Sequence, residues 1–257
     1  MTAPDENIVF LSSPDRFTPF QELYLQVRTK ENRLLDDEIV KELPYTNKVI
    51  GSQLQEWHVR ANTCSEIKKY LSKVKSRAKV LDLGCGNGWL SAQLAQLETL
   101  DVTGLDINLT ELEQAARIFS SPNLHFCFGN IFEDIFEPET FDFILLNASI
   151  QYFENLPLLF DRLFFFLKKE GEIHIMDSPM YLEEEVWIAK QRSKDYYASM
   201  GFPAMASHYY HHSYEELSFT NYEILNNKKT FQKITNRVLN RHHETFPWIR
   251  IRNVRNS

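Results

Sequence analysis

At 257 residues with a formal net charge of −7, the chain has the size of one large domain, or of one domain with an added lobe. The negative charge argues against an exposed nucleic-acid surface, because neutralising phosphates requires a basic stripe. No apolar run approaches the roughly 20 residues of a membrane span, and Met1 to Phe10 lacks the pattern of a signal peptide.

Helical periodicity precedes the first expected strand. We expect helices over about 18–32, 34–43 and 52–74, after an irregular arm at residues 1–17. Together these segments make residues 1–78 a helical extension, which we expect to cap the edge of the sheet that follows.

A strand, a glycine-rich turn and the start of a helix occupy residues 79–90. Glycines stand at alternate positions of the turn, Gly84, Gly86 and Gly88, where a ligand can approach without meeting a Cβ atom. A dinucleotide fingerprint places its third glycine one residue later, where Trp89 stands here. The spacing therefore argues against a nicotinamide-dinucleotide site.

Strands and helices then alternate, which predicts a parallel sheet covered by helices on both faces. The expected strands are 100–105, 124–128, 141–147 and 172–177, and the expected helices are 90–97, 109–119, 156–167 and 181–200. Residues 168–171 are expected to end the helix at 156–167 as a basic turn and cap. Two later strands, within 219–225 and 245–252, suit an antiparallel hairpin, with a mixed or helical segment at 229–240 between them.

The segment from Gly201 to His212 breaks this pattern, because histidines and tyrosines crowd it. It is either an exposed loop or a lid that touches a substrate. The H-x-x-H-H spacing has no supporting carboxylate, and the three cysteines show no C-x-x-C, so we expect no metal site. The odd number of cysteines predicts reduced thiols and a cytoplasmic location.

Two motifs resemble those of a known family. The run from Asp82 to Gly88, D-x-G-x-G-x-G, resembles the first motif of the class I S-adenosylmethionine-dependent methyltransferases, and Phe141 to Asn147 resembles the fourth. The resemblance covers residues 79–177 in detail and the C-terminal hairpin in outline. It implies a Rossmann-like, doubly wound α/β fold with a seven-stranded, mostly parallel sheet whose last strand is antiparallel. Residues 79–257 would form this domain, with an insertion or lid around 179–218.

The resemblance implies that S-adenosylmethionine lies over the carboxyl edge of the sheet. The turn at Gly84, Cys85 and Gly86 would hold its methionine part, and Asp82 would organise the turn and the amino group. Arg60, in the extension, either faces the cofactor carboxylate or is a solvated charge.

Further cofactor contacts are expected at the ends of the next strands. Asp106 follows Gly86 by 20 positions, a spacing that suits an acidic side chain on the ribose hydroxyls; its alternative role is a helix cap. Ile107 would pack on the adenine. Asn130, where the family often has Asp, would accept from the adenine amino group beside Ile131, and Asn147 would close the site.

The acceptor would lie beyond the cofactor. Residues placed to contact it are Gln151, Tyr152, His208, Tyr209 and His211. No residue identifies itself as a catalytic base.

These observations predict a methyltransferase that acts on a small molecule, with no nucleic-acid or membrane partner and with its oligomeric state left open. Alternatives are a non-catalytic module that keeps the cofactor fold, a nicotinamide-dependent oxidoreductase, or another enzyme that uses S-adenosylmethionine. Binding of S-adenosylmethionine without turnover would favour the first alternative, and binding of a nicotinamide cofactor would favour the second.

Overall fold

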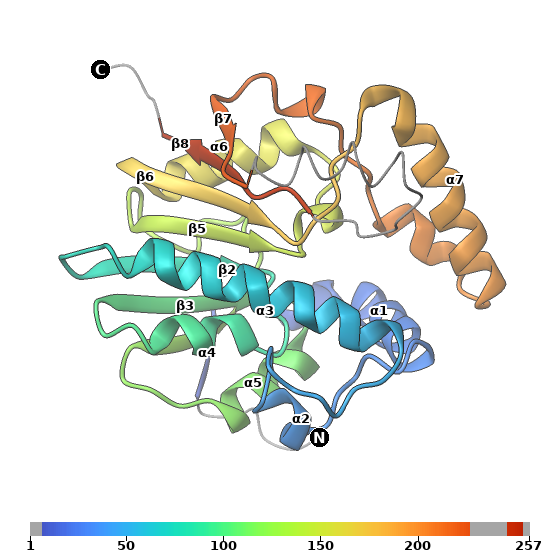
Figure 1. Cartoon of the computed structure of the whole chain (residues 1–257), viewed down its shortest axis with the longest axis horizontal. Helices are drawn as coiled ribbons and strands as arrows, with labels where there is room; N and C mark the ends of the chain where they lie inside the picture. Colours follow the sequence, from blue (N-terminus) through green and yellow to red (C-terminus); the bar gives the residue numbers. More distant parts are fainter. Residues whose placement is uncertain (1–6, 227–245, 254–257) are drawn as a thin grey trace.

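Eight strands hydrogen-bond into one sheet in the order β1-β4-β3-β2-β5-β6-β8-β7 (Figure 1). The computed structural model describes residues 7–226 and 246–253. The strands are β1 (Ile8–Phe10), β2 (Ala78–Leu83), β3 (Leu100–Asp106), β4 (Leu124–Phe128), β5 (Phe141–Asn147), β6 (Leu167–Met176), β7 (Tyr222–Ile224) and β8 (Ile249–Arg252).

All neighbouring pairs among β1 to β6 are parallel, whereas β8 runs antiparallel to both β6 and β7. The central strand β2 pairs Val80 with Val102 of β3 and Leu81 with Ile144 of β5, and all four side chains are buried. Strands buried on both faces read as continuous apolar runs, as these do. The doubly wound α/β prediction is therefore confirmed.

Helices cover both faces of the sheet and form two hydrophobic cores. On one face, α3 (Ser52–Leu71), α4 (Trp89–Ala95) and α5 (Leu109–Ile118) bury their apolar stripes together (Figure 1). On the other face, α6 (Leu156–Phe166) buries Phe160 and Phe166 against β5 and β6. No helix within 7–226 and 246–253 is both long and apolar enough to cross a membrane.

A third, smaller hydrophobic cluster lies beyond the carboxyl ends of the strands. There α1 (Thr18–Lys30) and α7 (Glu183–Ser199) stand on the side towards which the parallel strands point (Figure 1). Val27 of α1 and Tyr197 of α7 pack with Met205 of the 3₁₀ segment η3 (Pro203–His208). This lobe is built from segments far apart in the chain. It lies beyond the carboxyl ends of the central strands β2, β3, β5 and β6.

Three sequence predictions differ from the structure. Residues 8–10 are not irregular, because they form β1 by pairing with Phe126–Phe128 of β4, which makes eight strands and not seven. Residues 168–171 are not a helix cap but the first half of β6, where Lys168 forms an ion pair of 2.9 Å with Asp142 of β5. The helix expected at 34–43 shrinks to α2 (Asp37–Val40). The segment at 229–240 lies outside the described residues.

Candidate functional site

The glycine turn connects β2 to α4 and is held against the end of β3. The backbone N–H groups of Gly84 and Cys85 both donate to the carbonyl of Leu105, at 2.8 and 3.2 Å. Gly86 and Gly88 have φ of +52° and +74°, a left-handed conformation that disfavours other residues. A Cβ atom on Gly88 would lie 2.7 Å from the side chains of Ala115 and Phe126, so this glycine also permits close packing of the turn on the neighbouring helix and strand.

Asp106 joins the glycine turn to the end of β3. Its carboxylate accepts from the N–H of Gly86 at 2.7 Å and from the N–H of Asn108 at 2.8 Å. Burial raises the pKa of Asp106, and these N–H groups oppose the rise. Asn108, and not Asp106, caps α5, because its side chain accepts from the N–H of Glu111 at 3.3 Å.

Asp82 lies beneath the turn, 1% exposed. It accepts a hydrogen bond of 2.6 Å from the Ser91 hydroxyl, which anchors the first turn of α4. Burial, together with the nearby Asp106, raises the pKa of this carboxyl to about 6. Ser91 opposes this shift by donating to the charged form.

Glu111 is a carboxylate of this site that sequence reasoning missed. Its oxygens lie 3.6 Å from where a Cβ atom on Gly86 would stand, so the side chain faces the turn. Burial and the charge of Asp106 raise its pKa to about 7, while Arg28 and Tyr24 of α1 lower it. The sequence signal was present, since an acidic residue three positions after a capping Asn belongs to the first helical turn, but this pattern does not reveal burial.

A cavity of about 110 Å³ opens over the turn. Six residues expected at the cofactor line it: Arg60, Asp82, Gly84, Cys85, Gly86 and Asn147. Residues that line it and that sequence reasoning missed include Tyr24, Arg28, Arg33, Asn87 and Glu111.

Four expected cofactor residues do not line this cavity: Asp106, Ile107, Asn130 and Ile131. The side-chain oxygen of Asn130 accepts from the N–H of Phe132 at 3.2 Å, and the side chain of Ile131 is buried in the core on the α6 face. Their roles towards adenine therefore stay predictions.

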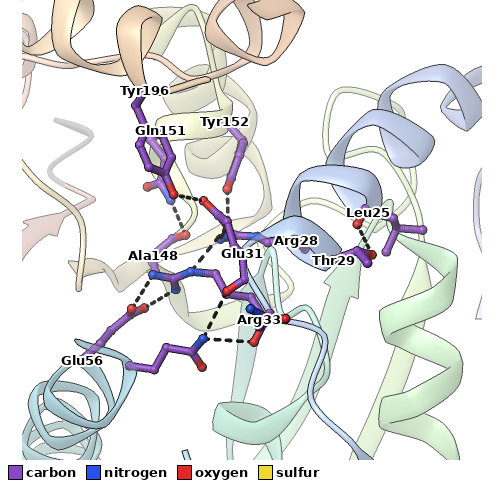
Figure 2. Close-up of polar contacts among 12 residues, drawn as sticks. Leu25, Arg28, Thr29, Glu31, Arg33, Glu56, Ala148, Gln151, Tyr152 and Tyr196 are labelled. Atoms are coloured by element: carbon purple, nitrogen blue, oxygen red, sulfur yellow. Dashed lines mark hydrogen bonds and ion pairs between the residues drawn. The ribbon is translucent and has the colours of Figure 1, made fainter. Parts of the chain in front are cut away.

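An arginine–glutamate network spans the gap between α1 and α3 (Figure 2). Arg28 forms an ion pair with Glu31 at 3.1 Å, and Arg33 contacts Glu31 at 3.5 Å and Glu56 at 2.7 Å. Arg60 completes the network with Glu56 at 2.7 Å and lies over the Trp57 ring. Arg60 is thus neither freely solvated nor unpartnered; it lines the cavity while sharing a carboxylate.

The same network ties the N-terminal segment to the rest of the site. Arg28 donates to the Tyr152 hydroxyl at 2.8 Å, and the Tyr196 hydroxyl of α7 donates to Glu31 at 2.8 Å (Figure 2). Contacts between positions more than 100 residues apart hold the lobe over the sheet edge.

A second cavity, of about 670 Å³, adjoins the first and shares Arg28, Arg33, Arg60 and Ala148 with it. Its volume lies in the range of about 300–1,000 Å³ that is common for ligand sites. Four residues expected at an acceptor line it: Gln151, Tyr152, Tyr209 and His211. His208 does not, because its ring packs on Phe20 with centroids 5.3 Å apart. The neighbouring histidines have different hydrogen-bond partners: His211 is bonded to Ser193, and His212 is bonded to Glu216.

The side chains at the turn fit S-adenosylmethionine, which carries a carboxylate and two positive groups. The side-chain oxygens of Asn87 and Asn147 are buried beside the turn with no hydrogen-bond partner among the described residues. Such orphaned acceptors suit an ammonium or hydroxyl group of a ligand. The arginines of the lining suit the carboxylate, and its acidic side chains suit the positive groups.

Comparison with known proteins agrees with this geometry. The sequence matches the family described as "Methyltransferase domain" over residues 74–239. It is 37% identical over 99 residues to trans-aconitate 2-methyltransferase of Deinococcus radiodurans, covering 38% of this chain and 37% of that protein. It is 30% identical over 148 residues to phosphoethanolamine N-methyltransferase 1 of Triticum aestivum, covering 54% of this chain and 30% of that protein. These matches span about a third of the length of the curated relatives.

Solved structures share the fold. The YcgJ protein of Bacillus subtilis has a TM-score of 0.55 at 14% identity, covering 75% of this chain and 98% of that chain. Phosphoethanolamine N-methyltransferase 2 of Haemonchus contortus, in complex with S-adenosyl-L-methionine, has a TM-score of 0.51 at 18% identity, covering 74% and 51%. Since the family match covers well over half of the sequence and the sheet has the matching topology, the chain belongs to the class I S-adenosylmethionine-dependent methyltransferases.

Proposed function

We propose that the protein transfers a methyl group from S-adenosylmethionine to a small-molecule acceptor. One observation carries the proposal: the cavity over the glycine turn, lined by six of the residues expected at the cofactor, adjoins a second cavity large enough for a small molecule. Two adjoining sites are what a transfer between two bound molecules requires.

When bound, S-adenosylmethionine supplies a methyl group on a positively charged sulfur, which is already a good leaving group. The protein's task is therefore to position the acceptor and to keep water away. Such alignment can lower a barrier by about 7–11 kcal/mol. Asp106 would hold the ribose, Asp82 would fix the turn and Arg60 would face the carboxylate, while the lobe of α1 and α7 would shield the acceptor.

The acceptor is proposed from the cavity and from the relatives. Relatives are named for methylating trans-aconitate, phosphoethanolamine and the malonyl group of an acyl carrier protein. These three groups are the first acceptors to test. We further propose that neither a nucleic acid nor a membrane is a partner, which the net charge of −7 supports. Three free, buried cysteines support a cytoplasmic location.

We extend the proposal to the arrangement of the chain. Residues 1–78 would act as the extension that caps the cofactor edge, and residues around 179–218 as a lid over the acceptor. Support comes from α1 and α7, which pack together through Val27 and Tyr197 beyond the strand ends.

The proposal is tested by isothermal titration with S-adenosylhomocysteine. Wild-type protein should bind it with micromolar affinity, and Asp106→Asn and Asp106→Ala should weaken binding at least tenfold. The control is Asp134→Asn, since that side chain is 89% exposed and lies away from both cavities. Thermal unfolding checks that each variant folds. If the folded wild type binds neither S-adenosylhomocysteine nor NADH, the fold is a scaffold without cofactor and the proposal fails.

A further inference from the structure

Many hydroxyl-bearing and charged side chains line the larger cavity. Its lining includes five tyrosines, Tyr152, Tyr181, Tyr196, Tyr197 and Tyr209, and four arginines, Arg28, Arg33, Arg60 and Arg192. Carboxylates and a histidine are also present, whereas aliphatic side chains are few. A cavity of this composition suits a polar or charged molecule more than an acyl chain.

The end of the cavity nearest the sheet carries two unusual backbone conformations. Ala148 and Asp177 follow the neighbouring strands β5 and β6 directly, and they have φ of +54° and +49°. The N–H of Ala148 donates to the carbonyl of Met176 at 2.9 Å, which places the two residues side by side. Residues other than glycine in this left-handed region cost about 1–3 kcal/mol and are concentrated at functional sites.

Asp177 lines this end of the cavity, and one of its carboxylate oxygens has no partner among the described residues. The side chain is 7% exposed and lines the larger cavity. Its Oδ1 atom accepts from the Thr63 hydroxyl at 2.7 Å, while Oδ2 is buried without a partner among the described residues. Burial raises the pKa of Asp177; Arg60 opposes the rise, and Glu56 and Glu66 add to it. A buried acceptor oxygen without a partner calls for a ligand that donates, such as an amine.

Helix α7 contributes a further arginine, Arg192, to the cavity lining. Arg28, Arg33 and Arg60 share Glu31 and Glu56, so their charges are largely balanced. Arg192 differs, because within residues 7–226 and 246–253 no carboxylate lies within ion-pair distance of it, and the Tyr181 hydroxyl is 3.5 Å away.

His211 is another polar residue of the lining. It is 4% exposed, and its Nδ1 atom is buried without a hydrogen-bond partner among the described residues. Burial, together with the charges of Arg192 and Lys190, lowers its pKa to about 4, so the ring is neutral at pH 7. If the Ser193 hydroxyl donates to Nε2 across their 2.9 Å contact, the free Nδ1–H can donate to an anion. Arg192, which has no carboxylate partner among the described residues, and His211, whose Nδ1 atom has no hydrogen-bond partner among them, therefore both line the cavity.

From this polarity we propose that the methyl acceptor carries both an amino group, held by Asp177, and a carboxylate or phosphate, held by Arg192. The proposal rests on the proposed function and names the acceptor class of the same site. The amine lies at the sheet end, beside Ala148, which lines both cavities. The ammonium gives one proton to the Asp177 carboxylate; the nitrogen lone pair then forms the N–C bond as the C–S bond breaks, and the sulfur keeps the electron pair of the broken C–S bond.

The test uses matched probes, titrated calorimetrically with and without saturating S-adenosylhomocysteine. Two-ended probes are O-phosphoethanolamine and the ω-amino acids from 3-aminopropionate to 6-aminohexanoate. One-ended controls are ethanolamine, ethyl phosphate and propionate. At least one two-ended probe should bind ten times more tightly, or better, than each of its one-ended counterparts. If no two-ended probe binds more tightly than its one-ended counterparts, the proposed acceptor class is wrong.

Two variants assign the ends. In Asp177→Asn, a two-ended probe should no longer bind more tightly than the probe that lacks the amine, while the affinity for ethyl phosphate should be unchanged. In Arg192→Gln, a two-ended probe should no longer bind more tightly than the probe that lacks the anion, while the affinity for ethanolamine should be unchanged. Lys194→Gln, two residues along α7 from Arg192 and outside the cavity, should change neither. An advantage that survives both variants would overturn the assignment of the two ends.

The same titrations separate this proposal from the broader one. If S-adenosylhomocysteine binds but no two-ended probe does, the inference about the acceptor fails and methyl transfer stands. If S-adenosylhomocysteine itself does not bind, the proposed function fails, and the acceptor inference fails with it. An unchanged affinity for S-adenosylhomocysteine in Asp177→Asn and Arg192→Gln shows that these variants remain folded.

Discussion

Asp82 is the group whose replacement gives the sharpest test of the site's electrostatics. It is a buried carboxyl with one hydroxyl partner, Ser91, and it has a folded-state pKa of about 6 against 3.8 for an ordinary aspartate. The folded protein therefore holds the Asp82 proton more tightly than the unfolded chain does. Its contribution to the free energy of unfolding is full below pH 3.8 and is lost as the pH rises through 6.

The size of this loss follows from the shift. A difference of roughly two pKa units corresponds to about 3 kcal/mol, and linkage assigns about 2 kcal/mol of it to the interval between pH 4.5 and pH 8. Asp82→Asn removes the titration but keeps an oxygen that can accept from the Ser91 hydroxyl. An unpartnered NH₂ group in the variant would change its stability by the same amount at every pH, so it does not affect the comparison between pH values.

Urea unfolding of wild type and Asp82→Asn at pH 4.5, 6 and 8 measures the effect. On raising the pH from 4.5 to 8, the wild type should lose about 2 kcal/mol relative to the variant. The exposed Asp134→Asn serves as the control and should follow the wild type. If the wild-type and Asp82→Asn curves run parallel over this range, Asp82 is ionised normally and the reasoning about its burial is refuted.

Two other positions give predictions of the same kind. Above pH 7 the Glu111 carboxylate is charged, so the affinity for cationic S-adenosylmethionine relative to S-adenosylhomocysteine should rise between pH 6 and pH 8, and calorimetry should find that Glu111→Gln abolishes the rise. Gly88→Ala should destabilise the protein by about 2–4 kcal/mol in urea unfolding, because its Cβ would lie 2.7 Å from Ala115 and Phe126 at a positive φ. Gly201→Ala, also at positive φ but facing open space, should cost only about 1 kcal/mol; equal losses would contradict the packing argument.

Most of the central sheet could be predicted because its signals are local. Strands β2 to β5 are short apolar runs between turns, and each begins and ends within about a residue of the expected position. The elements that were missed depend on distant partners. Residues 8–10 become a strand only because the edge of β4 offers them hydrogen bonds. The polar residues 168–171 form an irregular part of β6 between two pairs with β5, Leu167 with Phe141 and Glu172 with Phe143. Such pairing leaves no periodic pattern in the sequence.

The residues of the candidate site also fall into a group that local motifs predict and a group that depends on distant partners. The glycine turn and Asp106 follow from motif spacing, since both stand at strand ends. The arginine–glutamate network could not be predicted, because each charge read alone resembles a solvated side chain of a helix. Arg28 and Glu31 belong to the site only because α1 returns over the sheet edge and meets Tyr152 and Tyr196 there (Figure 2).

The central claim is that S-adenosylmethionine binds over the glycine turn, and a crystal structure with S-adenosylhomocysteine tests it most directly. We predict that the ribose hydroxyls contact the Asp106 carboxylate and that the methionine part lies beside Gly84 and Gly86, with the sulfur towards Ala148 and the larger cavity. Ligand bound elsewhere, or a saturated crystal with the ribose away from Asp106, would contradict the account.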